Sequence, residues 1–337
     1  MTVQTDMLVQ LTSAGLYCAA GDFHVDPWRP VPRAVITHAH ADHARSGMGV
    51  YYATHDGLPL LRQRLGRQAQ LRGVSYDQPF RLRGARVSLH PAGHVLGSAQ
   101  VRIEVNDEVW VVSGDYKRDP DSSCAPFQVV PCDTFITEAT FALPIYRWPP
   151  MHEVARDMLH WWRRNADAGK ASVLFCYSLG KAQRVLAELS ALTSEPAYLH
   201  GAMVPLVDLY RRAGVSMLPT RAVSEAPRGT DFSRSLILAP PASAGSPWMR
   251  RFRHPATGFA SGWMRIRGNR RRRGYDRGFV VSDHADWPSL LRTIRETGAQ
   301  RVLATHGRTD VLVRYLREEL GLAAAPLATP YGVEDGA

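Results

Sequence analysis

The sequence predicts an α/β fold in two parts, a first domain interrupted by a second α/β domain. The chain has 337 residues and is 45% hydrophobic, which is enough to bury the cores of two ordinary domains. Several apolar segments that read as strands lead directly into His, Asp or Glu. Because open sheets collect functional side chains at the carboxyl ends of their strands, this pattern indicates one shared site.

Residues 1–142 read as short strands separated by turns, with one helical stretch at 57–70. Prolines at positions 144, 149 and 150 make residues 143–150 a linker.

Residues 151–168 are predicted to form a helix, because Val154, Met158, Trp161 and Trp162 recur at roughly helical spacing. We assign both tryptophans to the core. Strands and helices then alternate as in a parallel α/β layer, at 171–177, 180–192, 197–199, 203–213 and 235–239. Residues 240–277 are rich in Gly, Arg and Pro and are expected to be mostly loop.

The remaining elements are expected to complete the first domain. They are a strand at 278–282, a helix at 287–297, a strand at 301–305 and a helix at 309–320, before a frayed tail at 323–337. We therefore expect a first domain of residues 1–142 and 278–337 and an inserted domain of residues 143–277.

The segment 38–43, which reads His-Ala-His-Ala-Asp-His after an apolar strand, places three imidazoles and a carboxylate within six residues. His38 and His40 are two positions apart, so in an extended chain both rings point to one side. A turn after Ala41 directs Asp42 and His43 toward a second point. Two ligand sets in one loop predict a dinuclear metal site.

Further ligands are expected at other strand ends. His94 lies in a glycine-broken β-like run, and Asp115 follows the strand 108–112 through Ser113 and Gly114. His90, close to His94 in the chain, is interpreted as structural.

These motifs together resemble the metallo-β-lactamase superfamily. The matching segments are 38–43, 92–98 with His94, 113–115 with Asp115, and 305–307 with His306. The long gap between Asp115 and His306 is similar to the β-CASP branch, whose nucleases carry a domain inserted before the final ligands. The segments 137–141 with Glu138, 280–286 with His284, 175–183 and 257–262 also resemble that branch. The similarity covers nearly the whole chain and is greatest to bacterial exonucleases associated with DNA ligase.

The resemblance implies a metallo-β-lactamase αββα sandwich with an inserted α/β β-CASP domain. The family's early strand-end Asp has two candidates here, Asp22 and Asp26, and the sequence leaves both open.

The resemblance also implies roles for the site residues. His38, His40 and His94 would bind one metal, Asp42, His43 and His306 the other, and Asp115 would bridge them. Imidazole-rich ligation favours Zn²⁺, with Mn²⁺ as the alternative. Asp42 and Asp115 would serve catalysis through the metals. His284 would contact the phosphate or protonate the leaving oxygen, oriented by Glu138 or Asp283.

Charge indicates a nucleic-acid partner. The net charge is +10, and ten arginines lie between positions 250 and 277 against one acid, Asp276. We expect Arg270, Arg271, Arg272 and Arg273 to bind the nucleic-acid backbone, and Ser282 to contact a phosphate. A second basic stretch contains Arg62, Arg64, Arg67, Arg72, Arg81, Arg83 and Arg86.

Composition further predicts a cytoplasmic protein. The chain has no long apolar run and a polar start, so neither a membrane span nor a signal peptide is expected. Its four cysteines show no CxxC spacing and are expected to be reduced and buried. We expect a monomer.

Three functions fit these observations. The first is a DNA exonuclease of repair that trims single strands or ends from 5′ to 3′, in functional association with a DNA ligase. The second is an RNA-processing ribonuclease of the same branch. The third is a small-ester or lactam hydrolase, which the insert and the arginines disfavour.

Overall fold

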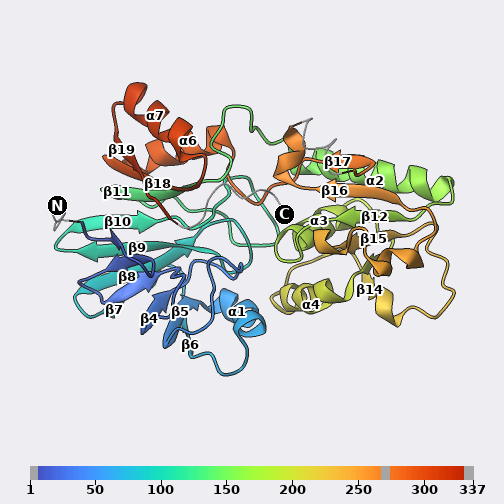
Figure 1. The fold of residues 1–337 in the computed structure, drawn as a ribbon, viewed down its shortest axis with the longest axis horizontal. Coiled ribbons are helices and arrows are strands. Elements are labelled where there is room, and N and C mark those ends of the chain that lie inside the picture. The colour runs from blue at the N-terminus through green and yellow to red at the C-terminus, as the bar shows by residue number, and fades with distance from the viewer. Residues whose placement is uncertain (1–6, 267–273, 330–337) are drawn as a thin grey trace. The chain divides into compact units, whose positions relative to one another are not determined.

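The computed structural model describes residues 7–266 and 274–329 (Figure 1). Within these ranges the chain divides into two compact units. The first contains the residues up to Pro120, Cys124–Pro144 and the residues from His284 onward, and the second contains Asp121–Ser123 and Ile145–Asp283. No helix of the described residues is long and apolar enough to cross a membrane.

The first unit contains two mixed sheets. The described strands of one sheet run in the order β1 (Gln10–Leu11), β2 (Leu16–Cys18), β3 (Phe23–Val25), β4 (Arg33–Val35), β5 (Val50–Thr54) and β6 (Leu71–Val74). The other runs β19 (Ala323–Pro326), β18 (Arg301–Gly307), β11 (Thr134–Ala139), β10 (Glu108–Val112), β9 (Ala99–Val105), β8 (Ala85–Pro91) and β7 (Phe80–Leu82). Strands β3 to β6 pair in parallel, as do β10, β11, β18 and β19.

Alternating side chains of the second sheet build two cores. Ile136 packs with Phe23 and Trp110 in the core between the sheets. Its neighbour Phe135 points the other way and packs with Leu290 and other residues of the helices α6 (Trp287–Thr297) and α7 (Thr309–Glu318). A strand buried on both faces carries apolar residues at successive positions, as β11 does. Helix α1 (Leu58–Leu65) follows β5 through a short 3₁₀ helix, His55–Gly57.

The second unit is built on a parallel sheet in the order β14 (Thr220–Ala222), β13 (Ala197–Leu199), β15 (Leu236–Ala239), β12 (Ser172–Phe175), β16 (Ala256–Ala260) and β17 (Arg277–Phe279). Helices α2 (Met151–Asp167), α3 (Lys181–Ser190) and α4 (Val204–Arg212) share a core with one face of the sheet. Trp161 and Trp162 are buried in that core, as predicted. Short 3₁₀ helices lie at Gly201–Met203, Val223–Glu225, Pro241–Ser243, Pro247–Arg251 and Gly262–Arg265.

Three expectations from the sequence differ from the structure. The stretch predicted as loop contains the strand β16, and the tail predicted to fray contains the strand β19. The strand expected at 278–282 in the first domain is β17, which pairs in parallel with β16 in the second unit. Pairing with a distant strand decides each of these positions, and local sequence carries little of that information.

The cysteines are all free, as expected, but only Cys18 and Cys176 are buried; Cys124 and Cys132 are partly exposed.

Candidate metal centre

The loop that follows β4 brings its ligand-type side chains together by local hydrogen bonds. The amide of Thr37 donates to Oδ1 of Asp26 over 2.8 Å, which fixes the start of the loop. The amide of Ala44 donates to the carbonyl of His40 over 2.9 Å and closes a turn. The turn expected after Ala41 thus runs from His40 to Ala44, so that Asp42 and His43 face a different point from His38 and His40.

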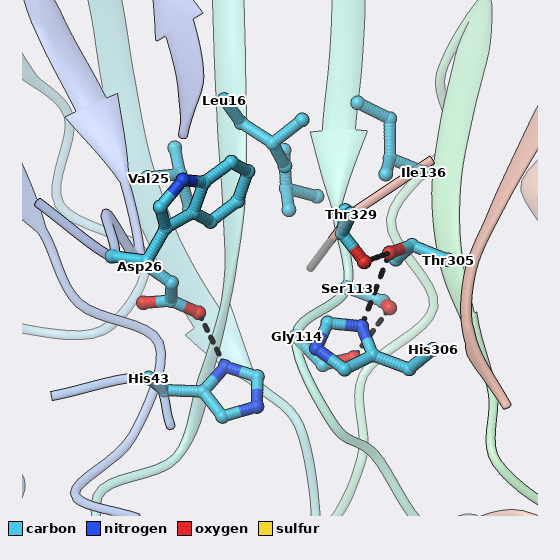
Figure 2. Close-up of a pocket in the computed structure, with 12 residues that line it drawn as sticks. Leu16, Val25, Asp26, His43, Ser113, Gly114, Ile136, Thr305, His306 and Thr329 are labelled. Atoms are coloured by element: carbon cyan, nitrogen blue, oxygen red, sulfur yellow. Dashed lines mark hydrogen bonds and ion pairs between the residues drawn. The ribbon is translucent and has the colours of Figure 1, made fainter. Parts of the chain in front are cut away.

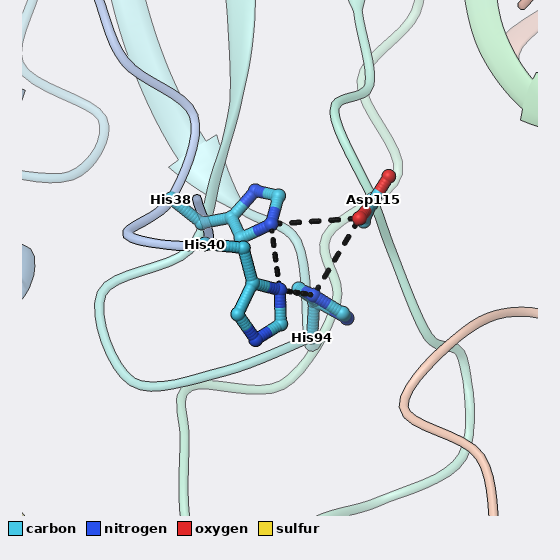
Figure 3. A group of neighbouring side chains, drawn as sticks. All are labelled: His38, His40, His94 and Asp115. Carbon is cyan, nitrogen blue, oxygen red and sulfur yellow. Dashed lines mark hydrogen bonds and ion pairs between the residues drawn. The ribbon is translucent and has the colours of Figure 1, made fainter. Parts of the chain in front are cut away.

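Three imidazoles and one carboxylate form the first group (Figure 3). Nδ1 of His40 lies 3.0 Å from Nε2 of His38 and 3.1 Å from Nε2 of His94. Oδ2 of Asp115 lies 3.4 Å from Nε2 of His38 and 3.7 Å from Nε2 of His94. The four side chains come from three separate strand ends, after β4, β8 and β10.

The protonation state of His38 in the first group is compatible with a bound cation. Burial holds the pKa of His38 well below its usual value, so the ring is neutral. Oγ1 of Thr37 donates to Asp26 over 2.5 Å and therefore accepts from Nδ1 of His38, 3.0 Å away. Nε2 of His38 then directs a lone pair at a carboxylate oxygen of Asp115, an arrangement that a metal ion between the two stabilises.

The second group contains Asp42, His43 and His306. Nε2 of His43 lies 3.5 Å from Oδ2 of Asp42 and 3.4 Å from Oδ2 of Asp115. The rings of His43 and His306 are stacked, with centroids 5.3 Å apart. The same oxygen of Asp115 is therefore 3.4 Å from a ring nitrogen in each group. Asp115 therefore approaches both groups, and its role as a bridging ligand stays a prediction.

The pKa values of the two histidines in the second group are shifted in opposite directions. Burial lowers the pKa of His306 to about 4, which keeps its ring neutral. Burial also acts to lower the pKa of His43, but the carboxylates of Asp115, Asp42 and Asp26 outweigh it and raise that pKa well above its usual value. Three carboxylates thus make this point of the site attractive to positive charge.

Glu138 and His284 form a hydrogen-bonded pair beside the first group. Nδ1 of His284 donates to Oε2 of Glu138 over 2.8 Å, and the amide of Tyr116 donates to Oε1 over 2.8 Å. Glu138 is only 1% exposed, so its carboxylate has a fixed orientation. The rings of His284 and His94 have centroids 4.8 Å apart. Of the two candidates that the sequence offered to orient His284, Glu138 makes the contact, whereas Asp283 forms an ion pair with Lys181 over 3.1 Å.

His306 reaches the site through a β-bulge. Glu138 pairs with Thr305 and Ala139 pairs with Gly307, so His306 is an extra residue in β18. Its φ of +59° lies in the left-handed region, and the next residue, Gly307, has a φ of +73°. Bulges redirect side chains next to functional sites. A strand without this bulge would send the imidazole of residue 306 in another direction.

The structure resolves the choice between Asp22 and Asp26. Asp26 lies in the site and accepts hydrogen bonds from Thr37. It also bonds His43 (Figure 2). Asp22 forms ion pairs with Arg33 and Arg83 instead. Sequence reasoning missed Thr37 altogether; its position directly before His38 at a strand end was the available signal.

A small cavity of about 30 Å³ lies behind the second group (Figure 2). Leu16, Val25 and Ile136 line one part of it, and Asp26, His43 and His306 line another. Apolar walls behind charged ligands lower the local dielectric constant and strengthen the interactions among them.

Other candidate residues lie outside this cluster. Arg270, Arg271, Arg272 and Arg273 fall outside the described residues. Ser282 belongs to the second unit, is 3% exposed, and its carbonyl accepts from Arg184. Ser282 is thus buried, and its contact with a phosphate stays a prediction. His90 bonds Ser88 and Asp77 instead of joining the ligands.

Comparison with known proteins gives one relative that matches nearly the whole chain. It is the "Probable DNA ligase" of Opitutus terrae, 32% identical over 322 residues, or 93% of this chain and 30% of that protein. "Endoribonuclease YSH1" of Mycosarcoma maydis is 24% identical over 57% of the chain and 26% of that protein. "Integrator complex subunit 11" of Danio rerio is 33% identical over 29% of the chain and 17% of that protein. The chain therefore spans less than a third of each of these relatives.

A scan against known family patterns finds no match. Among solved structures, the "Crystal Structure of a Protein of Unknown Function from Enterococcus faecalis V583" has a TM-score of 0.60 at 11% identity, covering 88% of this chain and 79% of that one. This likeness concerns the fold alone. With the sheets described above, the comparisons confirm the expected fold, a metallo-β-lactamase sandwich with an inserted α/β domain. The named relatives support the β-CASP nuclease family.

Proposed function

We propose that this chain is a metal-dependent nuclease that hydrolyses DNA phosphodiester bonds. The observation that carries the proposal is the central position of Asp115, whose Oδ2 lies 3.4 Å from a ring nitrogen of each ligand group. Two ligand groups that each have a ring nitrogen near Asp115 suit two divalent cations, Zn²⁺ by their imidazole content or Mn²⁺. When bound, such a pair of cations activates water and neutralises the charge of a phosphate.

Two side chains of the protein, His284 and Glu138, then provide the proton that hydrolysis needs. Hydrolysis forms a bond from a water oxygen to phosphorus and breaks a P–O ester bond, and the leaving oxygen needs a proton. Protonated His284 supplies it from Nε2, while its Nδ1–H stays bonded to Glu138. Glu138 therefore holds the ring in one orientation, and it is itself held by the amide of Tyr116.

DNA is the proposed substrate because the relative that matches 93% of the chain is named a probable DNA ligase. The same name supports a functional association with DNA ligation, as would suit an exonuclease that prepares ends in repair. We propose 5′ to 3′ trimming of single strands or frayed ends. The alternative is a ribonuclease, which the relatives named endoribonuclease favour.

The test uses end-labelled DNA and RNA strands of one sequence, incubated with the protein and Zn²⁺, Mn²⁺ or Mg²⁺. The expected result is stepwise shortening of linear single-stranded DNA and slow or no cleavage of RNA. A circular single-stranded DNA of matched length has no end and should resist cleavage. Equal cleavage rates of the circular and the linear DNA would establish an endonuclease. Faster cleavage of RNA than of DNA would establish the ribonuclease alternative.

A further inference from the structure

One arginine of the second basic stretch directly contacts the loop after β4 that contains His38, His40, Asp42 and His43, here called the ligand loop. Arg64 lies in the last turn of α1, and its Nε donates a 2.6 Å hydrogen bond to the carbonyl of Ala39. Ala39 is 2% exposed and lies between His38 and His40 in the chain. The guanidinium is thus one hydrogen bond away from the backbone that joins two ligands of the first group.

The other arginines of this stretch have different contacts. Arg62 donates to the carbonyls of the loop after α1, and Arg72 lies over the ring of Tyr52. Arg83 and Arg86 form ion pairs with Asp22 and Glu104. Arg67 and Arg81 are exposed on the surface of the first unit. Within the described part of the chain, Arg64 alone of this stretch bonds the ligand loop.

The hydrogen bond to Ala39 leaves most N–H donors of the Arg64 guanidinium available to a ligand. A guanidinium has five N–H donors in one plane, and the bond to Ala39 uses the one on Nε. Among the described residues, no further hydrogen bond or ion pair of Arg64 is present. The residue as a whole is exposed.

Arg64 also interacts with a residue of the second ligand group, Asp42. Burial lowers its pKa, while the carboxylate of Asp42, a ligand of the second group, acts in the opposite direction. The side chain of Asp42 is 30% exposed, which places that ligand at the open side of the site. A fixed planar fork with four free N–H donors beside such a site matches the oxygens of a phosphate.

We infer that Arg64 is a substrate-binding residue, which contacts a strand phosphate adjacent to the one being cleaved. This inference rests on the proposed nuclease function and assigns part of its substrate recognition to α1. The bond to Ala39 fixes the guanidinium in advance, so less rotamer entropy is lost when the phosphate binds.

The test compares Arg64→Ala and Arg64→Lys with Arg67→Ala, which removes an exposed arginine just after the same helix. Binding of a labelled single-stranded oligonucleotide to chelator-treated protein is measured over a range of salt concentrations. We expect Arg64→Ala to reduce the slope of log affinity against log salt by about 0.7, the value for one lost phosphate contact on a single strand. Arg64→Lys should retain most of that slope, and Arg67→Ala should retain all of it.

Kinetics on the metal-loaded protein supply the second readout. Arg64→Ala should raise KM for the oligonucleotide about tenfold, while its metal content and its turnover of bis(p-nitrophenyl) phosphate stay within twofold of the unmodified chain. That small diester has no adjacent phosphate and so cannot use the contact.

Three outcomes would overturn the inference. An unchanged salt slope and KM would show that Arg64 does not contact the strand. Loss of metal and of small-diester turnover in Arg64→Ala would show that Arg64 only stabilises the ligand loop. If the unmodified chain neither binds nor cleaves nucleic acid, the proposed function fails, and this inference fails with it.

Discussion

Nδ1 of His43 donates a 2.7 Å hydrogen bond to Oδ2 of Asp26, a residue 17 positions earlier in the chain. This bond leaves Nε2 of His43 directed at Asp42 and Asp115. A hydrogen bond to the far nitrogen of a metal-binding imidazole fixes its tautomer and raises its basicity. Asp26 also accepts from the amide and the hydroxyl of Thr37, so one carboxylate orients the start of the loop and one of its rings.

Replacing Asp26 with Asn should therefore weaken metal binding without unfolding the chain. We expect a loss of about 10- to 100-fold in affinity for Zn²⁺, measured by competition with a chromophoric chelator. Asp22→Asn is the matched control, because Asp22 pairs with arginines away from the ligands. Equal metal affinities for the two variants would contradict the role of Asp26.

Replacing Asp115 with Asn should abolish hydrolysis, because a neutral amide cannot serve both ligand groups as a charged bridge. Elemental analysis of protein purified without chelators should approach two metal equivalents for the unmodified chain and fall below that for Asp115→Asn. Asp107→Asn, in an exposed turn, should leave both values unchanged. A fully active Asp115→Asn enzyme would refute the dinuclear assignment.

Replacing His284 with Ala should lower turnover by about 10²- to 10⁴-fold, the scale of a lost proton donor or phosphate contact. Metal content should remain nearly intact, because His284 lies outside the proposed ligand set and Nδ1 of its ring donates to Glu138. His90→Ala removes a histidine that bonds Ser88 and Asp77, and it should change neither property. Loss of metal in His284→Ala would show that His284 is itself a ligand.

Replacing Gly307 with Ala should destabilise the first unit and displace His306. A Cβ at Gly307 would lie 2.4 Å from the carbonyl oxygen of Ala139, and φ there is +73°. Gly321 has a similar φ of +64° but open space around it, so Gly321→Ala isolates the backbone cost of about 1–2 kcal/mol. We expect Gly307→Ala to lower the free energy of unfolding by about 1–3 kcal/mol more than this control. Equal losses in denaturant unfolding would show that β18 shifts freely at the bulge.

Local signals were sufficient for several parts of this protein. Helix α6 begins and ends where the sequence predicted, because Asp286 caps its first turn and Gly298 adopts the left-handed conformation at its end. The ligand loop was equally recognisable in the sequence, since His38, His40, Asp42 and His43 are neighbours in the chain. Their separation into two groups follows from strand geometry and one turn.

Contacts between distant segments decided the rest. Asp22 and Asp26 look alike in the sequence, and only the packing of β3 beside β4 brings Asp26 to the loop that contains His43. The weak strand sequence of β19 is stabilised by parallel pairing with β18, which local propensity cannot indicate. His306 depends on a bulge defined by its partner strand, and the position of Arg64 beside Ala39 depends on the packing of α1. The sequence by itself determined which side chains could bind metal, because ligand chemistry belongs to the residues. The tertiary structure decided which residues support and surround these side chains, because those contacts join segments far apart in the chain.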